Sequence, residues 1–195
     1  MTLTLDERLN KIIALISSKD FLDGNGLGNE IGFWVFDYPP EREIDVRTFF
    51  DDTIRPALLK REPPVRVGTV HLLTLVTEVL QSRGLLDKVL EMQKNKGDEA
   101  TLAALRSVLK EDKLAHNIAN KFDIAQLDLL VLTGVGAVFP MLRTHTLLSA
   151  LHPIMGDTPL LMFFPGKYDG HSLRLFNALT EDHYYRAFRL IPETN

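Results

Sequence analysis

The glycine pair Gly134 and Gly136 is the feature of the sequence best suited to bind a small anion. An apolar run at 127–132 precedes it and helical spacing follows it, so free backbone N–H groups of the turn could hold a phosphate. Arg143 and His145, on or near the first turns of the expected helix, could add charge or hydrogen-bond donors. A dinucleotide fingerprint also needs a third glycine and an acidic residue after the next strand, and both are missing. A tight structural turn is therefore favoured, and a nucleotide site stays open as the alternative.

A second glycine turn, from Gly166 to Gly170, matches a phosphate-binding loop only in part. A Walker A loop has four residues between its glycines and a lysine before Ser or Thr, whereas here three residues intervene and His171 takes the place of the lysine. Because that cation is missing, a P-loop enzyme is not expected, although a degenerate relative without hydrolysis is compatible with the pattern. Lys167 and Tyr168 make the turn a candidate binding surface.

Carboxylates gather after another expected strand, where Asp37 is followed by Glu41, Arg42 and Glu43. They could bind a metal ion or act in acid–base chemistry, but a solvated, charged turn after two prolines is the simpler interpretation. The six histidines show no metal-ligand spacing, and Ser172 lacks the G-x-S-x-G elbow of serine hydrolases. The sequence therefore predicts no catalytic residue, no metal site and no cofactor.

The C-terminal third is rich in aromatic residues, most of which we expect in the core. Lys167, Arg174, Arg186 and Arg189 are interleaved with them, and Tyr and Arg are common anchors of protein interfaces. The pattern is compatible with a partner surface or with a weak nucleic-acid patch.

The composition is that of an ordinary globular domain. The chain has 195 residues, 45% hydrophobic and 25% charged, which suits one hydrophobic core and a single domain over 1–195. A net charge of -4 argues against a domain-wide binding face for nucleic acid. The lack of cysteine fits a reducing compartment, and neither a signal peptide nor a membrane span is predicted. We therefore expect a cytoplasmic protein.

Apolar periodicity predicts helices that alternate with strands. A capping box of Thr4 and Glu7 opens an amphipathic helix, and the glycines at 24, 26 and 28 form a loop before the first strand. A helical stretch at 85–122 is interpreted as an insertion. The other predicted strands lie at 33–37, 65–70, 127–132, 159–164 and 184–191, and the other predicted helices at 47–60, 72–80, 141–151 and 172–179.

Strands that are apolar almost throughout and separated by helices predict an α/β fold. They favour a mainly parallel sheet with helices on both faces, either Rossmann-like or like a degenerate P-loop fold. In such folds, ligands bind beyond the carboxyl ends of the strands. Asp37, the Gly134 turn and the Gly166 turn should then converge at one rim of the sheet.

The sequence resembles the BrxB family of BREX (bacteriophage exclusion) systems. The resemblance rests on four stretches: WVFDYPPERE at 34–43, LDLLVLTGVGAVFPMLRTH at 127–145, TPLLMFFPGKYDG at 158–170, and the ending from LRLF to YYRAFRL at 173–190. It extends across nearly the whole chain apart from 85–122, and its C-terminal block is the most specific part.

The resemblance implies a small cytoplasmic component of a bacterial antiphage system, encoded beside a large ATPase, a DNA methyltransferase and the alkaline-phosphatase-like PglZ protein. It brings no catalytic motif, so it implies a non-enzymatic adaptor that docks on PglZ or bridges other BREX components. A nucleotide-binding regulatory domain and, less favoured, a DNA-binding module stay open as alternatives. The expected docking or anion-binding residues are Asp37, Arg42, Gly134, Gly136, Arg143, His145, Gly166, Lys167, Tyr168, Gly170 and Arg174.

Overall fold

The fold is organised around a mainly parallel β-sheet, as predicted. The computed structural model describes residues 2–23, 32–180 and 187–194. Neighbouring parallel strands follow the order β2-β3-β4-β1-β7. Their bounds are Phe33–Tyr38 for β1, Val67–His71 for β2, Leu129–Thr133 for β3, Leu160–Tyr168 for β4 and Phe188–Arg189 for β7. The predicted loop at 24–31 lies outside the described residues, as does the first part of the predicted strand at 184–191.

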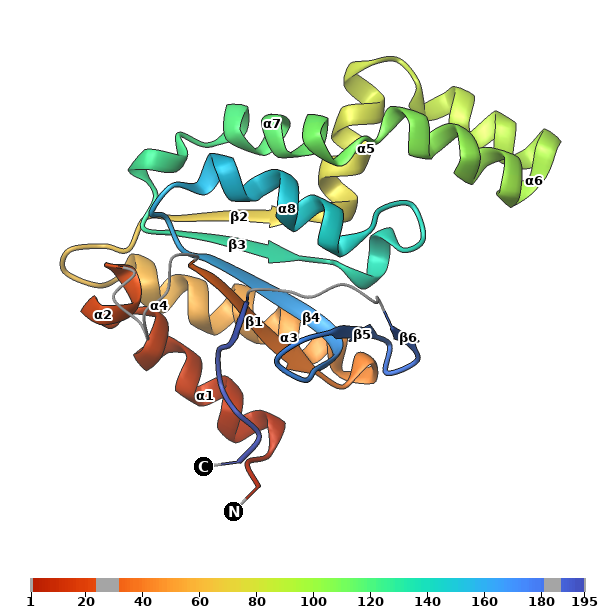
Figure 1. The fold of residues 1–195 in the computed structure, drawn as a ribbon. Coiled ribbons are helices and arrows are strands. Elements are labelled where there is room, and N and C mark those ends of the chain that lie inside the picture. Colours follow the sequence, from red (N-terminus) through yellow and green to blue (C-terminus); the bar gives the residue numbers. More distant parts are fainter. Residues whose placement is uncertain (1, 24–31, 181–186, 195) are drawn as a thin grey trace.

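Helices cover both faces of the sheet, so its central strands are buried on both sides (Figure 1). Strand β3 shows why, because Leu129 and Val131 point into one apolar cluster while Leu130 and Leu132 point into the other. The first cluster is closed by α1 (Leu5–Ile16), α2 (Lys19–Leu22), α3 (Glu43–Phe49) and α4 (Arg55–Leu59). The second is closed mainly by α5 (Leu72–Ser82), α7 (Glu111–Lys121) and α8 (Thr144–Met155).

Local signals placed α1 correctly, but they did not predict the short α2, and the next predicted helix has different boundaries. The capping box exists, since the Glu7 N–H donates to the Thr4 hydroxyl at 3.3 Å and the Thr4 N–H donates to the Glu7 carboxylate at 2.7 Å. The helix predicted at 47–60 begins earlier, with α3, and passes through a π-helical turn at Phe50–Ile54 into α4. Pro56 follows that turn and has no N–H with which to continue a regular hydrogen-bond ladder.

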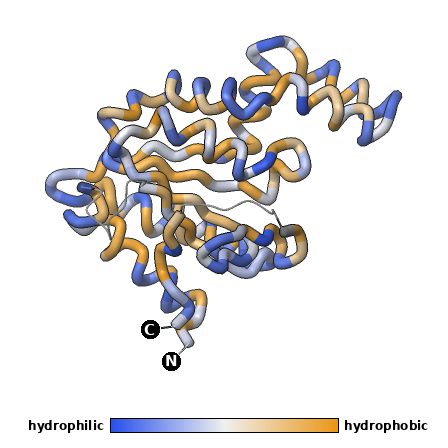
Figure 2. The backbone as a smooth tube through the Cα atoms, viewed as in Figure 1, coloured by the Kyte–Doolittle hydropathy of each residue, from blue (hydrophilic) through white to orange (hydrophobic). Residues whose placement is uncertain are grey.

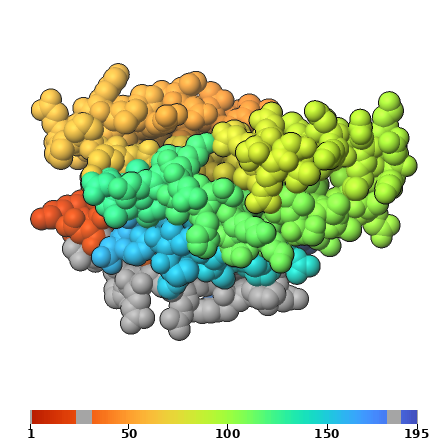
Figure 3. Space-filling view, turned by 90° about the horizontal axis from the view of Figure 1, so that it is seen from above, coloured from red at the N-terminus to blue at the C-terminus, as the bar shows by residue number. Residues whose placement is uncertain are grey.

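The predicted helical stretch at 85–122 forms α6 (Leu86–Val108) and α7. Gly97 interrupts α6 with φ 78° and ψ 179°, so its two halves form a hairpin that reaches past the sheet (Figures 1 and 3). Figure 2 shows mainly hydrophobic strands in the centre and a hydrophilic far end of α6. Within the described part of the chain, no helix has the length and apolar composition required to cross a membrane.

The C-terminal part of the sheet differs from the prediction. Strand β4 does not end at 164: it leaves β1 where Tyr38 pairs with Pro165, continues to Tyr168 and pairs with antiparallel β5 (Leu173–Leu175). Strand β5 in turn pairs with β6 (Leu179–Thr180), so the helix predicted at 172–179 is wrong. Leu173 and Leu175 are buried while the residue between them is exposed, which is the period of a strand.

A buried carboxylate holds the two ends of the chain against the sheet. One oxygen of Asp37 accepts from the Arg8 guanidinium at 2.6 Å, and the other accepts from the Tyr168 N–H at 3.0 Å and faces Arg189 at 3.2 Å. Arg8 also donates to the Ile191 carbonyl. The Asp37 side chain is only 1% exposed, so the predicted solvated turn is wrong at this position. We call these five residues the Asp37 clasp.

Replacing Asp37 with Asn should remove the charge that both arginines face. Because loss of one partner leaves the other charge buried, we expect the free energy of unfolding to fall by roughly 3 kcal/mol in urea denaturation. Asp45→Asn is the matched control, since it breaks an exposed ion pair to Arg42 and should cost less than about 1 kcal/mol. Equal losses in the two variants would show that the clasp stabilises the fold no more than a surface pair.

Candidate functional site

The predicted rim exists at the carboxyl ends of β3, β4 and β1, which are neighbours in the sheet. The turn after β3 lies against the end of β4: a Cβ built on Gly136 would come 3.1 Å from the Pro165 side chain. Tyr38, the last residue of β1, pairs with Pro165 from the other side. Three segments that are distant in the sequence therefore meet at one edge.

The glycines of the rim permit close packing. Gly134 has φ 72°, and a Cβ there would lie 2.5 Å from the His71 ring; a Cβ on Gly136 would lie 2.8 Å from the Phe176 ring. A Cβ on Gly166 would overlap the carbonyl oxygen of Arg174. Side chains and backbone thus occupy the space beside all three glycines, which accounts for glycine at these positions without a bound anion.

The turn after β3 does not lead directly into a helix. A single 3-10 turn at Gly136–Val138 is followed by extended Phe139, because a residue before proline disfavours helical backbone. Helix α8 begins later, with Arg143 exposed as its N-cap residue and His145 in its first turn. Arg143 and His145 therefore belong to the start of α8, and the glycine turn is not a helix N-terminus of the kind that binds phosphate.

An exposed aromatic pair lies at the rim, and the sequence patterns did not predict it. Phe139 is 42% exposed and Phe176 is 39% exposed, with ring centroids 6.2 Å apart and ring planes at 89°. Phe176 has φ 54° and Asn177 has φ 60° in the turn between β5 and β6. A left-handed backbone costs a bulky residue about 1–3 kcal/mol. We call Phe139 and Phe176 the rim aromatic pair.

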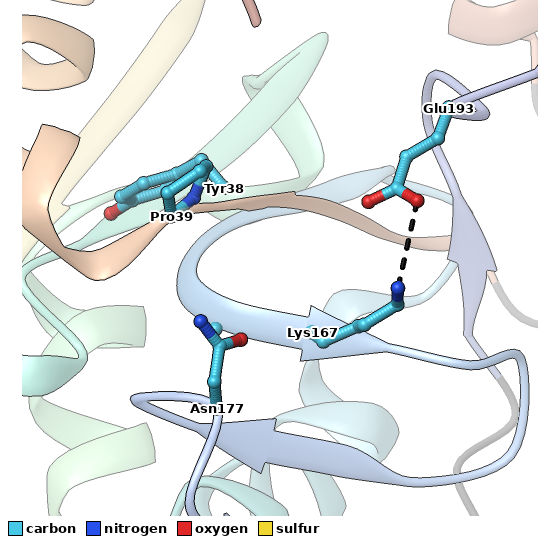
Figure 4. Close-up of a pocket in the computed structure, with 6 residues that line it drawn as sticks. Tyr38, Pro39, Lys167, Asn177 and Glu193 are labelled. Carbon is cyan, nitrogen blue, oxygen red and sulfur yellow. Dashed lines mark ion pairs between the residues drawn. The ribbon is translucent and has the colours of Figure 1, made fainter. Parts of the chain in front are cut away.

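A cleft of about 260 Å³ opens beside the same turn (Figure 4). Lys167 and Glu193 face each other in it at 3.6 Å, with Asn177 on the side of the β5–β6 turn. The Tyr38 hydroxyl donates to Glu43, and burial together with that carboxylate raises the pKa of the phenol. The cleft is lined by Tyr38, Pro39, Gly166, Lys167, Asn177 and Glu193.

The remaining predicted residues serve separate local structures. Tyr168 is fully buried, and its hydroxyl donates to the Ala187 carbonyl at 2.7 Å, while Arg42 pairs with acidic residues at the surface. Gly170 lies in an exposed loop where Asp169 accepts from two backbone N–H groups, which lower the pKa of its carboxyl to about 2. Arg174 is exposed on β5, opposite Lys167.

Asn177 is the residue from which the turn that presents Phe176 could have been predicted. Asn tolerates the left-handed backbone, and it follows a run in which Leu173 and Leu175 alternate with other residues, which is a hairpin pattern. The short apolar run also fits a helix, and that prediction leaves out the turn and its exposed Phe176.

Comparison with known proteins gives a consistent result over most of the chain. The family model of the BREX protein BrxB matches residues 68–190. A BREX protein BrxB from Escherichia coli is 40% identical over 190 residues, covering 97% of this chain and 93% of that relative. Another from Bacillus cereus is 39% identical over 193 residues, covering 97% of this chain and 98% of that relative. No solved structure matches the chain.

The packing role of Gly134 can be separated from its backbone conformation. Gly134→Ala and Gly97→Ala both place Ala at a positive φ, but a Cβ at Gly97 would have no atom within 4 Å apart from the adjoining backbone and neighbouring residues. We expect each to lose stability, with a further 1–3 kcal/mol or so at Gly134 from the overlap with His71. Thermal unfolding of both variants tests this. When His71→Ala is combined with Gly134→Ala, the extra loss of stability at Gly134 should disappear. An equal effect at the two glycines would contradict the packing role.

Proposed function

The chain belongs to the BrxB family of BREX proteins, and from that premise we propose that it is a non-enzymatic subunit that binds other BREX proteins. BrxB is a component of a BREX system, which makes this a protein of antiphage defence. The proposed first partner is PglZ, with the BREX ATPase and methyltransferase as further partners, and the proposed location is the cytoplasm.

The rim aromatic pair is the observation that carries this proposal. Aromatic side chains are frequent anchors of protein interfaces because they bury a large area at a small cost in conformational entropy. Phe139 and Phe176 come from different segments yet contact each other edge to face, and both are exposed. The charged and polar residues of the neighbouring cleft, Lys167, Asn177 and Glu193, would form the polar rim that surrounds such anchors.

The strain at Phe176 supports the same role. A glycine or asparagine would occupy its left-handed backbone at less cost, so the large aromatic ring is not explained by the turn alone. Strained residues of this kind concentrate at functional sites. Gly136 leaves room for the Phe176 ring, and a side chain there would displace it. The fold thus holds this ring in place at the surface.

The described residues give no support to the nucleotide-binding alternative. Its candidate turns are occupied, since His71 lies against Gly134 and the Phe176 ring lies against Gly136. Direct DNA binding likewise has no described feature beyond exposed cations such as Arg174. Protein binding is therefore the function that we propose.

Removing the rim aromatic pair should weaken binding to PglZ while the fold stays intact. We expect Phe139→Ala combined with Phe176→Gly to lower the affinity at least about tenfold, because each ring would be an anchor and Gly suits the backbone of the turn. The measurement is titration calorimetry with purified PglZ, supported by co-purification from cells at native expression.

Leu90→Ala is the matched control, because Leu90 is 55% exposed on α6 and distant in the sequence from the rim. It should leave the affinity unchanged. Binding of PglZ by the double variant at full strength, with circular dichroism showing a native fold, would overturn the rim as the docking surface. If the unaltered protein binds PglZ neither in cells nor in the calorimeter, PglZ is not its partner.

A further inference from the structure

We infer that the open edge of β2 is a second binding surface, which accepts an extended, acidic segment of a partner protein as an added strand. Strand β2 is at the end of the sheet and pairs with β3 alone among the described strands. The surface includes neither residue of the rim aromatic pair, so the inference does not require PglZ to be the partner at the rim.

The outward backbone groups of β2 can be assigned from one contact. The Arg66 carbonyl accepts from the N–H groups of Asp128 and Leu129, so the peptide groups of residue 66 point toward β3. Successive residues of a strand point their N–H and C=O groups to opposite sides. Val67 and Thr69 therefore point both groups away from β3, toward the open edge, in the pattern that pairs with an incoming strand. His71 points its N–H the same way, while its carbonyl lies at the N-cap of α5 and begins that helix.

A groove of about 330 Å³ runs along this edge. It has a wall on each face of the sheet, formed by α4 on one side and by α5 and α7 on the other. The floor and walls include half-buried apolar groups, so side chains of an added strand would find apolar contacts as well as backbone partners. The lining residues are Arg55, Val67, Thr69, Val70, His71, Thr74, Leu75, Lys121 and Phe122.

An unsatisfied hydroxyl in the groove points to a missing neighbour. Thr69 lines the groove, and its Oγ1 is shielded from solvent without a hydrogen-bond partner in the described part of the chain. A buried polar group left unpaired costs about 1–3 kcal/mol. A Thr or Ser placed opposite Thr69 on an added strand could satisfy it, since hydroxyl pairs form across neighbouring strands.

Arg55 gives the groove an exposed cation that an acidic segment could pair with. Arg55 is exposed and makes no ion pair within the described residues, whereas Lys121 pairs with Glu78 at 2.8 Å. A carboxylate of the added strand near Arg55 would form an ion pair with it. A second copy of this chain would instead bring another Arg55 toward the same edge, so like-charge repulsion disfavours self-pairing.

The test begins with selection of short random-sequence peptides on the full-length protein. We expect the selected peptides to alternate β-branched residues and to carry Asp or Glu. Thr69→Pro removes an outward N–H without touching the ladder to β3, and Arg55→Glu reverses the charge; each should weaken binding about tenfold or more. Lys88→Glu, on α6, is the control for charge reversal and should bind as the unaltered protein does.

Amide hydrogen exchange supplies an independent readout. On binding of a selected peptide, the amides of Val67, Thr69 and His71 should become protected, while Gly68 and Val70 are already protected by β3. Failure to enrich any peptide, equal affinity for Arg55→Glu, or protection without this alternation would overturn the inference.

The variants also separate the possible outcomes. If Thr69→Pro does not fold, Arg55→Glu and the exchange pattern decide. Self-association of the free protein that is lost in Arg55→Glu would replace the acidic partner with a second copy. The double variant Phe139→Ala, Phe176→Gly should bind the peptides normally, so that failure at the edge and failure at the rim can be told apart.

Discussion

The buried carboxylate of Asp37 is the constraint on which the arrangement of this molecule depends. It contacts Arg8 of α1, the backbone of β4 and Arg189 of β7, so one ionised group joins the N-terminal helix, the central sheet and the C-terminal strand. A buried charge is tolerated only when paired and hydrogen-bonded, and both oxygens of Asp37 are. The end of β1 is therefore closed by the protein's own groups.

Because the end of β1 is closed, this rim differs from the ligand-binding edge of many α/β sheets. In many open parallel sheets, the carboxyl ends of the strands frame a crevice for a ligand. Here the Asp37 clasp occupies the end of β1, His71 and Phe176 occupy the space beside the glycines, and β4 continues into a hairpin. A small cleft and a pair of aromatic rings are accessible at this rim, which suits contact with a protein surface better than enclosure of a small molecule.

Local sequence patterns predicted the elements that depend on interactions between neighbouring residues. The capping box placed α1, and the unbroken apolar run of β3 indicated a strand buried on both faces. The clasp could not be foreseen, because Arg8 lies 29 positions from Asp37 and Tyr168 lies 131 positions from it. The sequence around an aspartate at the end of a strand does not show whether its side chain contacts solvent or a distant arginine. The exposed rings were missed for a related reason, since their pairing joins a turn after β3 to a hairpin after β4.

The reversal of α6 at Gly97 has a consequence for how the chain can vary in length. Apart from the adjoining backbone and neighbouring residues, a Cβ at this tip would have no atom within 4 Å. The hairpin extends beyond the sheet, away from the ends that the Asp37 clasp joins (Figure 1). Additional turns of helix inserted there would lengthen both halves without altering the register of any strand. The arm is thus a natural place for a guest domain or a reporter, carried at a distance from the core that supports it.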